Sequence, residues 1–289
     1  MMPERRPRRR TPFAITGLRA SRKAIIERPP FLPLLMPAVP ALELHTVLIL
    51  AAVGLFAGVQ NALAGGGSFI TFPALLLAGL NPVAANMTST IAMFPSQTTS
   101  AIAGRKLAGG VAGLSFKQLI GISFGGGILG AILLMITPPT FFAKLVPWLV
   151  LFATSVFAWG SFRSKPLHAV SAMPTGVLVA VQTCIAIYGG YFGGGIGFLM
   201  LAALTIAGQQ IRMATATKNM LAMAMNASAT LIFAFSGMIS WPAALALCVG
   251  GVAGGLCGSW LIHRMPEKVM RGFVVLVGAA LTVWMFARA

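Results

Sequence analysis

The chain has 289 residues, of which 57% are hydrophobic and only 9% are charged. A soluble core of this length could not bury so much apolar surface under so few charges, so the composition predicts a protein of the lipid bilayer. The formal net charge of +17 does not indicate nucleic-acid binding, because the basic residues gather in the N-terminal tail and in short loops between apolar segments.

The N-terminal tail, residues 1–43, is rich in arginine and proline and shows little apolar periodicity. This composition predicts a disordered segment ahead of the membrane region. The tail is either a contact for anionic lipids or an extension of little consequence.

Five apolar segments follow in the first half of the chain. They predict helices at Leu44–Ala64, Ser68–Leu80, Val83–Ala103, Gln118–Ile136 and Leu145–Phe162. Most approach the ~20 residues that span ~30 Å of hydrocarbon, but Ser68–Leu80 is too short. Because it follows a run of three glycines, we expect it to be a half-helix beside unwound backbone.

The second half repeats this pattern. Predicted helices lie at Pro174–Gly190, Ile196–Gly208, Ala214–Phe235, Pro242–Ile262 and Val269–Ala287, and the short second segment again follows a triglycine. The glycine runs Gly126–Gly130 and Gly254–Gly258 also correspond, and we expect them to be helix-contact surfaces. The sequence therefore predicts an all-α polytopic membrane protein with two homologous repeats, 44–162 and 174–289. A cytoplasmic linker at 163–173 is expected to join them.

Loop charges indicate how the repeats are oriented. Arg105, Lys106 and Lys117 mark a cytoplasmic loop, whereas Thr137–Ala143 and Gly237–Trp241 are neutral and expected outside. The charged loop of the first repeat corresponds to the neutral Gly237–Trp241 turn of the second. That exchange predicts inverted repeats.

Acidic side chains are almost absent. The chain has no aspartate, and its carboxylates are at or beyond the ends of apolar segments: Glu4, Glu27, Glu43 and Glu267. No catalytic group, metal site or cofactor is predicted, and a carboxylate-based proton antiporter or metal-ion pump is disfavoured.

The two triglycines mark the predicted substrate site. A helix that begins after Gly67 or Gly195 offers unpaired backbone N–H groups and the positive end of its dipole, which together suit an anion. A tight hairpin is the alternative for each triglycine. Hydroxyl and amide side chains of the next helices add candidates, although they could bond within or between helices instead. The predicted substrate-binding residues are Gly65, Gly66, Gly67, Ser68, Thr88, Ser89, Gly193, Gly194, Gly195, Thr217, Lys218 and Asn219.

Lys218 is a cation inside an apolar segment with no carboxylate near it in sequence. It either extends to the membrane interface or faces the cavity and compensates the charge of a substrate.

The repeated pattern of triglycine, short apolar helix and Ala85-Asn86-Met87-Thr88-Ser89, with its counterpart at Ala214–Lys218, resembles the TauE/SafE family of sulfite and organosulfonate exporters. The resemblance implies a bacterial inner-membrane permease of two homologous halves for sulfite, sulfonates or related anions. We therefore expect a non-enzymatic, multi-pass secondary transporter of a small anion, in which one repeat rocks against the other. Its expected partners are the anionic substrate and the lipid bilayer. An anion channel and a non-transporting membrane scaffold are the alternatives.

Overall fold

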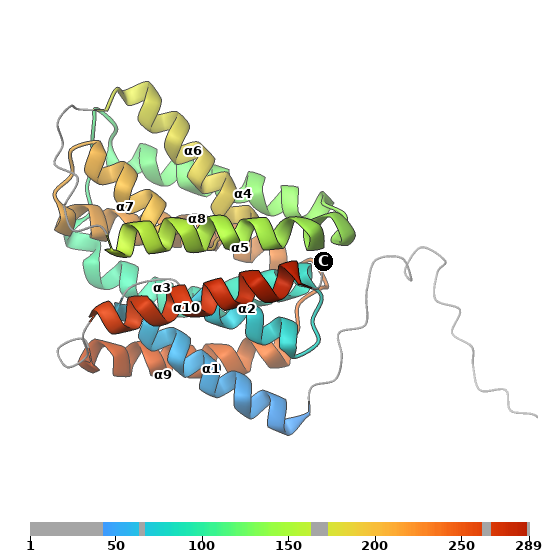
Figure 1. Ribbon diagram of the computed structural model, residues 1–289. Coiled ribbons are helices and arrows are strands. Elements are labelled where there is room, and N and C mark those ends of the chain that lie inside the picture. The colour runs from blue at the N-terminus through green and yellow to red at the C-terminus, as the bar shows by residue number, and fades with distance from the viewer. Residues whose placement is uncertain (1–42, 64–66, 163–172, 262–266, 288–289) are drawn as a thin grey trace, which may run out of the picture. The chain divides into compact units, whose positions relative to one another are not determined.

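The computed structural model describes residues 43–63, 67–162, 173–261 and 267–287. In these ranges the regular elements are helices, with one isolated β-bridge between Val111 and Leu114 (Figure 1). The helices are α1 (Leu44–Leu63), α2 (Ser68–Leu77), α3 (Pro82–Gly104), the short 3-10 helix η1 (Arg105–Leu107), α4 (Phe116–Ile136), α5 (Pro139–Phe162), α6 (Thr175–Tyr191), α7 (Ile196–Ile206), α8 (Ile211–Ala234), α9 (Trp241–Leu261) and α10 (Glu267–Phe286).

Each predicted apolar segment corresponds to one of these α-helices. The largest difference is at α5, which begins at Pro139 instead of the predicted Leu145. Proline is well suited to the first position of a helix, where its missing N–H is not needed. Most of the neutral loop predicted at 137–143 is therefore helical, and that prediction was wrong. The predicted tail 1–43 falls almost entirely outside the described residues, as does most of the linker 163–173.

Local sequence sets several of the helix starts. The Asn81 side chain accepts a hydrogen bond from the Ala84 N–H, and Pro82 follows it at the first helical position of α3. Before α4, Ser115 and Gln118 bond reciprocally in a capping box.

Three helices in the described part of the chain are long and apolar enough to cross a membrane, judged by length and composition alone. They contain the stretches Leu44–Asn61, Phe116–Ile136 and Pro139–Gly160. Helices α2 and α7, with 10 and 11 residues, are too short for a full crossing. These two helices follow the triglycines, as expected.

Two close helix pairs connect the two halves of the chain, α1 with α9 and α4 with α6 (Figure 1). Glycines let the backbones approach in both pairs. A Cβ added at Gly58 of α1 would lie 2.1 Å from the Gly251 carbonyl oxygen of α9. One added at Gly130 of α4 would lie equally close, 2.1 Å, to the Ile187 oxygen of α6. The predicted runs take part in both pairs, because a Cβ added at Gly254 of α9 would lie 1.9 Å from the Leu55 carbonyl oxygen of α1. The expectation that the glycine runs serve helix contact is confirmed at Gly130 and Gly254.

Gly130→Val should therefore destabilise the protein much more than Gly125→Val on the same helix. The first valine must displace the α6 backbone, a strain of roughly 1–3 kcal/mol or more, whereas a Cβ at Gly125 meets nothing within 4 Å. Thermal unfolding in detergent measures the difference. Equal unfolding temperatures for the two variants would contradict the assigned α4–α6 contact.

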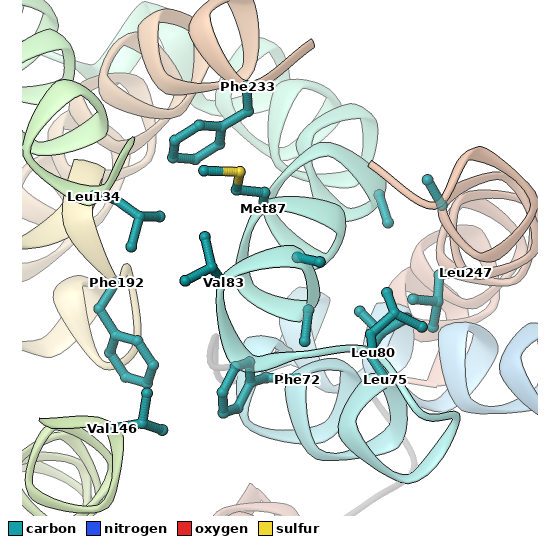
Figure 2. Close-up of a cluster of buried hydrophobic side chains, with 14 of the residues drawn as sticks. Phe72, Leu75, Leu80, Val83, Met87, Leu134, Val146, Phe192, Phe233 and Leu247 are labelled. Carbon is teal, nitrogen blue, oxygen red and sulfur yellow. The ribbon is translucent and has the colours of Figure 1, made fainter. Parts of the chain in front are cut away.

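The hydrophobic interior is also built from both halves. One cluster combines buried side chains from several helices, including Phe72 and Met87 with Leu134, Phe192 and Phe233 (Figure 2). A second cluster is formed by α4, α6, α7 and α8. The core thus does not divide along the sequence boundary between the predicted repeats.

Candidate functional site

A cavity lies beside the break between α6 and α7. Its volume is about 20 Å³, and since one ordered water requires roughly 10–15 Å³, it has room for one or two water molecules. Five helices and the break contribute its lining: Ser68, Phe69 and Phe72 of α2, Asn86, Ser89, Thr90, Met93 and Gln97 of α3, Val150 of α5, Phe192, Gly193 and Gly194 of the break, Asn226 of α8 and Leu281 of α10.

The second triglycine forms a true interruption of the helical chain. Helix α6 ends at Tyr191 and α7 begins at Ile196, with φ at +79° for Gly193 and +75° for Gly195. Side chains with a Cβ rarely adopt this left-handed backbone, so glycine is required at both positions. No side chain caps the α7 N-terminus, and its first N–H groups are left without helical partners.

Of the first triglycine the structure describes only Gly67, whose backbone is right-handed with φ at −53°, unlike that of Gly195. Helix α2 begins at Ser68 after Gly67, again without a side-chain cap, while Gly65 and Gly66 lie outside the described residues. Ser68 lines the same cavity as Gly193 and Gly194. Two uncapped helix N-termini, one from each half, are therefore at or next to a single cavity whose described lining carries no charged side chain. Both helix dipoles favour negative charge there.

Hydrogen bonds fix the walls of the cavity. Asn86 of α3 donates from Nδ2 to the Tyr191 carbonyl oxygen at 3.0 Å, and the Tyr188 hydroxyl donates to the Gly194 carbonyl oxygen at 2.9 Å. These bonds satisfy the Tyr191 and Gly194 carbonyl groups, and the N–H groups of Phe192 and Gly193 bond to the Tyr188 carbonyl oxygen. The backbone donors left at the break are therefore those from Gly194 onward, at the start of α7. On the other wall, the Ser89 hydroxyl lies 2.6 Å from that of Thr71.

Four of the predicted site residues meet in this cavity: Ser68, Ser89, Gly193 and Gly194. Gly67 and Gly195 immediately precede the two short helices but are not in the lining. The remaining described candidates lie elsewhere.

The predicted site residues Thr88 and Thr217 each accept a hydrogen bond from the backbone of a loop. Thr88 Oγ1 accepts from the Ser240 N–H at 3.3 Å, in the segment before α9. Thr217 Oγ1 accepts from the Gly109 N–H at 3.1 Å, in the segment before α4. Each threonine therefore tethers a loop of the other half of the chain.

Lys218 is partly buried in α8 beside the first turn of α7. Its Nζ lies 3.7 Å from the position that a Cβ on Gly197 would take, and neither Lys218 nor Asn219 is in the cavity lining. Within the described residues the only ion pair joins His45 and Glu43, both exposed. The Lys218 ammonium is thus near the second break and has no carboxylate partner in the described part of the chain.

The list of predicted site residues omitted several lining residues, among them the amides Asn86 and Gln97 and the aromatic rings of Phe72 and Phe192. It also omitted Asn226, although the polar stripe of that helix is expected from the sequence to face inward. The two rings come from α2 and from the break and pack edge to face, with centroids 5.7 Å apart (Figure 2). For two of the amides, Gln97 and Asn226, the sequence contains a signal, namely their spacing in the duplicated chain. Gln97 and Asn226 are 129 positions apart, the same separation as Thr88 and Thr217, which had already been matched between the halves.

Residues of the metal-binding types do not gather in the described part of the structure, where no group of three His, Cys, Asp or Glu side chains occurs.

Comparison with known proteins identifies the family. A family model described as "Sulfite exporter TauE/SafE" matches residues 50–285. A "probable membrane transporter protein ORF9" of a Sinorhizobium species is 28% identical over 85% of this chain and 94% of its own length. YfcA of Escherichia coli K12, also a "probable membrane transporter protein", is 28% identical over 81% of this chain and 87% of its own length. A "probable membrane transporter protein" of Haemophilus influenzae is 30% identical over 82% and 93%, respectively.

No solved structure matches the chain. The family match spans most of the sequence and includes both triglycines, the cavity and all ten α-helices in whole or in part. The chain is therefore a member of the sulfite exporter TauE/SafE family of membrane transporters.

Proposed function

We propose that the protein is a multi-pass permease that carries a small anion and binds it in the cavity between α2, α3 and the α6–α7 break. The observation that carries this proposal is the meeting of two uncapped helix N-termini, from opposite halves, at one cavity. Backbone N–H groups and helix dipoles at such a place favour an anion without any charged side chain in contact with it.

The proposed substrate is sulfite, a sulfonate or a related small sulfur-containing or organic anion. The family description names sulfite, and the cavity lining combines polar groups, including Ser68 and Ser89, with the apolar rings of Phe72 and Phe192. At about 20 Å³ the cavity would widen to admit such an anion. Since the relatives are bacterial, we assign the permease to the bacterial inner membrane.

Pairs of equivalent contacts support two homologous repeats at 44–162 and 174–289. Exchanging the halves turns the α1–α9 pair into α6–α4, and α2–α3 into α7–α8, and all of these pairs are in contact. The bond from Thr88 to the loop before α9 likewise becomes the bond from Thr217 to the loop before α4. The proposal that the two repeats are inverted rests on the loop charges, because the charged loop after α3 corresponds to the neutral Gly237–Trp241 turn after α8.

The proposed transport cycle is alternating access, with moving bodies that each combine helices from both repeats. Helix α1 is packed backbone to backbone on α9, and α6 on α4. A rocking of one whole repeat against the other would have to separate these glycine contacts. Movement of α1, α2 and α9 together against α4, α6 and α7 would preserve them and would open the cavity at the crossing of α3 and α8.

Purified protein in proteoliposomes tests the function. We expect saturable counterflow of radiolabelled sulfite or methanesulfonate, because a carrier has a fixed number of sites and a limited turnover. Flux that rises without saturation, together with a measurable current, would instead indicate an anion channel. Absence of both binding and flux for these anions would contradict the proposal and favour a scaffold.

A further inference from the structure

We propose that Gln97 donates hydrogen bonds to the transported anion and that Asn226 holds the Gln97 amide in the orientation that makes this possible. Gln97 would be a specificity-determining residue, and Asn226 a positioning residue that acts through it. The inference rests on the proposed anion transport.

The first step is the bond between the two amides. Asn226 Nδ2 of α8 donates to Gln97 Oε1 of α3, and both residues line the cavity. Asn226 is almost fully buried, with 4% of its surface exposed. With Oε1 bonded to Asn226, the Gln97 amide is oriented, and the two N–H bonds of Nε2 are its donors to a solute.

The second step is that two neighbouring polar groups of the lining already donate hydrogen bonds to backbone carbonyl groups of the protein. The Thr90 hydroxyl donates to the Asn86 carbonyl oxygen at 3.0 Å, and Asn86 Nδ2 donates to the Tyr191 carbonyl oxygen. Gln97 is half-buried, and the structure gives its Nε2 no hydrogen bond among the described residues, so this donor is accessible in the cavity lining. An anion in the cavity can accept from it, and a hydrogen bond to a charged acceptor is among the stronger ones.

The third step is the location of the pair. Gln97 and Asn226 join α3 to α8, the two helices that follow the short helices in each half. Their separation of 129 positions makes them counterparts in the duplicated chain. The pair therefore bonds across the contact between the two halves, where both helix N-termini are close, and a donor there acts on the same solute as those N-termini.

Two variants that break the same amide–amide bond separate a binding role from a structural one. Gln97→Met removes the donors together with the bond, whereas Asn226→Leu removes the bond and leaves the Gln97 donors in place. We expect Gln97→Met to raise the dissociation constant for sulfite and methanesulfonate about tenfold, the value of one hydrogen bond to a charged group. Asn226→Leu should raise it only about threefold, because Gln97 is present but less well oriented. The double variant should equal Gln97→Met, since Asn226 acts only through Gln97.

Equilibrium binding to the purified full-length protein, with thermal unfolding measured in parallel, gives the readouts. Equal dissociation constants for the two single variants would show that only the bond matters and would overturn the inference, as would an unchanged constant in Gln97→Met. Failure of the wild-type protein to bind either anion would instead overturn the proposed function on which the inference rests.

Discussion

Gly194→Val should abolish anion flux while leaving a folded protein in the membrane. Gly194 lines the cavity, and a Cβ there would lie 2.7 Å from Cε1 of Phe192, another lining residue. The valine would occupy a space of about 20 Å³ and push the Phe192 ring into what remains. Gly194 does not have a positive φ, so the backbone accepts a side chain and the loss would come from the blocked cavity. Flux in proteoliposomes measures the effect.

Gly176→Val is the matched control, because Gly176 lies in α6 and a Cβ there meets nothing within 4 Å. It should transport as the wild-type protein does. If Gly194→Val transported at the wild-type rate, the cavity would not be part of the transport pathway.

Lys218→Met should weaken anion binding about thirtyfold. For an assumed separation of about 8 Å between the ammonium and the anion, two unit charges interact by about 2 kcal/mol at an effective dielectric constant of about 20. This energy corresponds to that factor in affinity. The ammonium lies against the first turn of α7, beside Gly197, and has no carboxylate partner within the described residues. We therefore expect it to act on the anion through its field and not by contact. Dissociation constants for sulfite provide the measurement.

Lys117→Met changes the net charge of the protein by the same amount at an exposed position at the start of α4. It should leave the affinity unchanged, which separates the local field of Lys218 from the overall surface potential. Lys218→Arg should retain part of the affinity, because the charge stays while its geometry changes. The same affinity in Lys218→Met as in Lys117→Met would show that Lys218 has no part in binding.

The positions of the helices could be predicted from the sequence because apolar length and glycine or proline punctuation are local signals. Both triglycines directly precede a short helix, at Ser68 and Ile196, as predicted. The start of α5 could not be located in the same way, because Pro138 and Pro139 are compatible with a loop and with a first helical turn.

The side-chain partners within the site were less predictable. Ser89 and Thr88 are adjacent, yet Ser89 lines the cavity while Thr88 bonds to Ser240 in the loop before α9. The choice depends on a loop far away in the sequence. The pair of Gln97 and Asn226 likewise exists only once α3 packs on α8. Periodicity places residues on one helix and carries no information about the helix opposite.

The pairing of α1 with α9 also has a consequence for how the protein is made. The glycine face of α1, with Gly54 and Gly58, has its partner in a helix that begins only at Trp241. Ribosomes add about 5–20 residues per second. The time between synthesis of the end of α1, at Leu63, and the start of α9, at Trp241, is therefore on the order of 10 to 40 s. During that interval the small-residue surface of α1 is open to lipid and to the glycine faces of other nascent chains. Biogenesis therefore depends on α1 remaining available, and a membrane chaperone that shields glycine-rich helices would raise the yield of the folded protein.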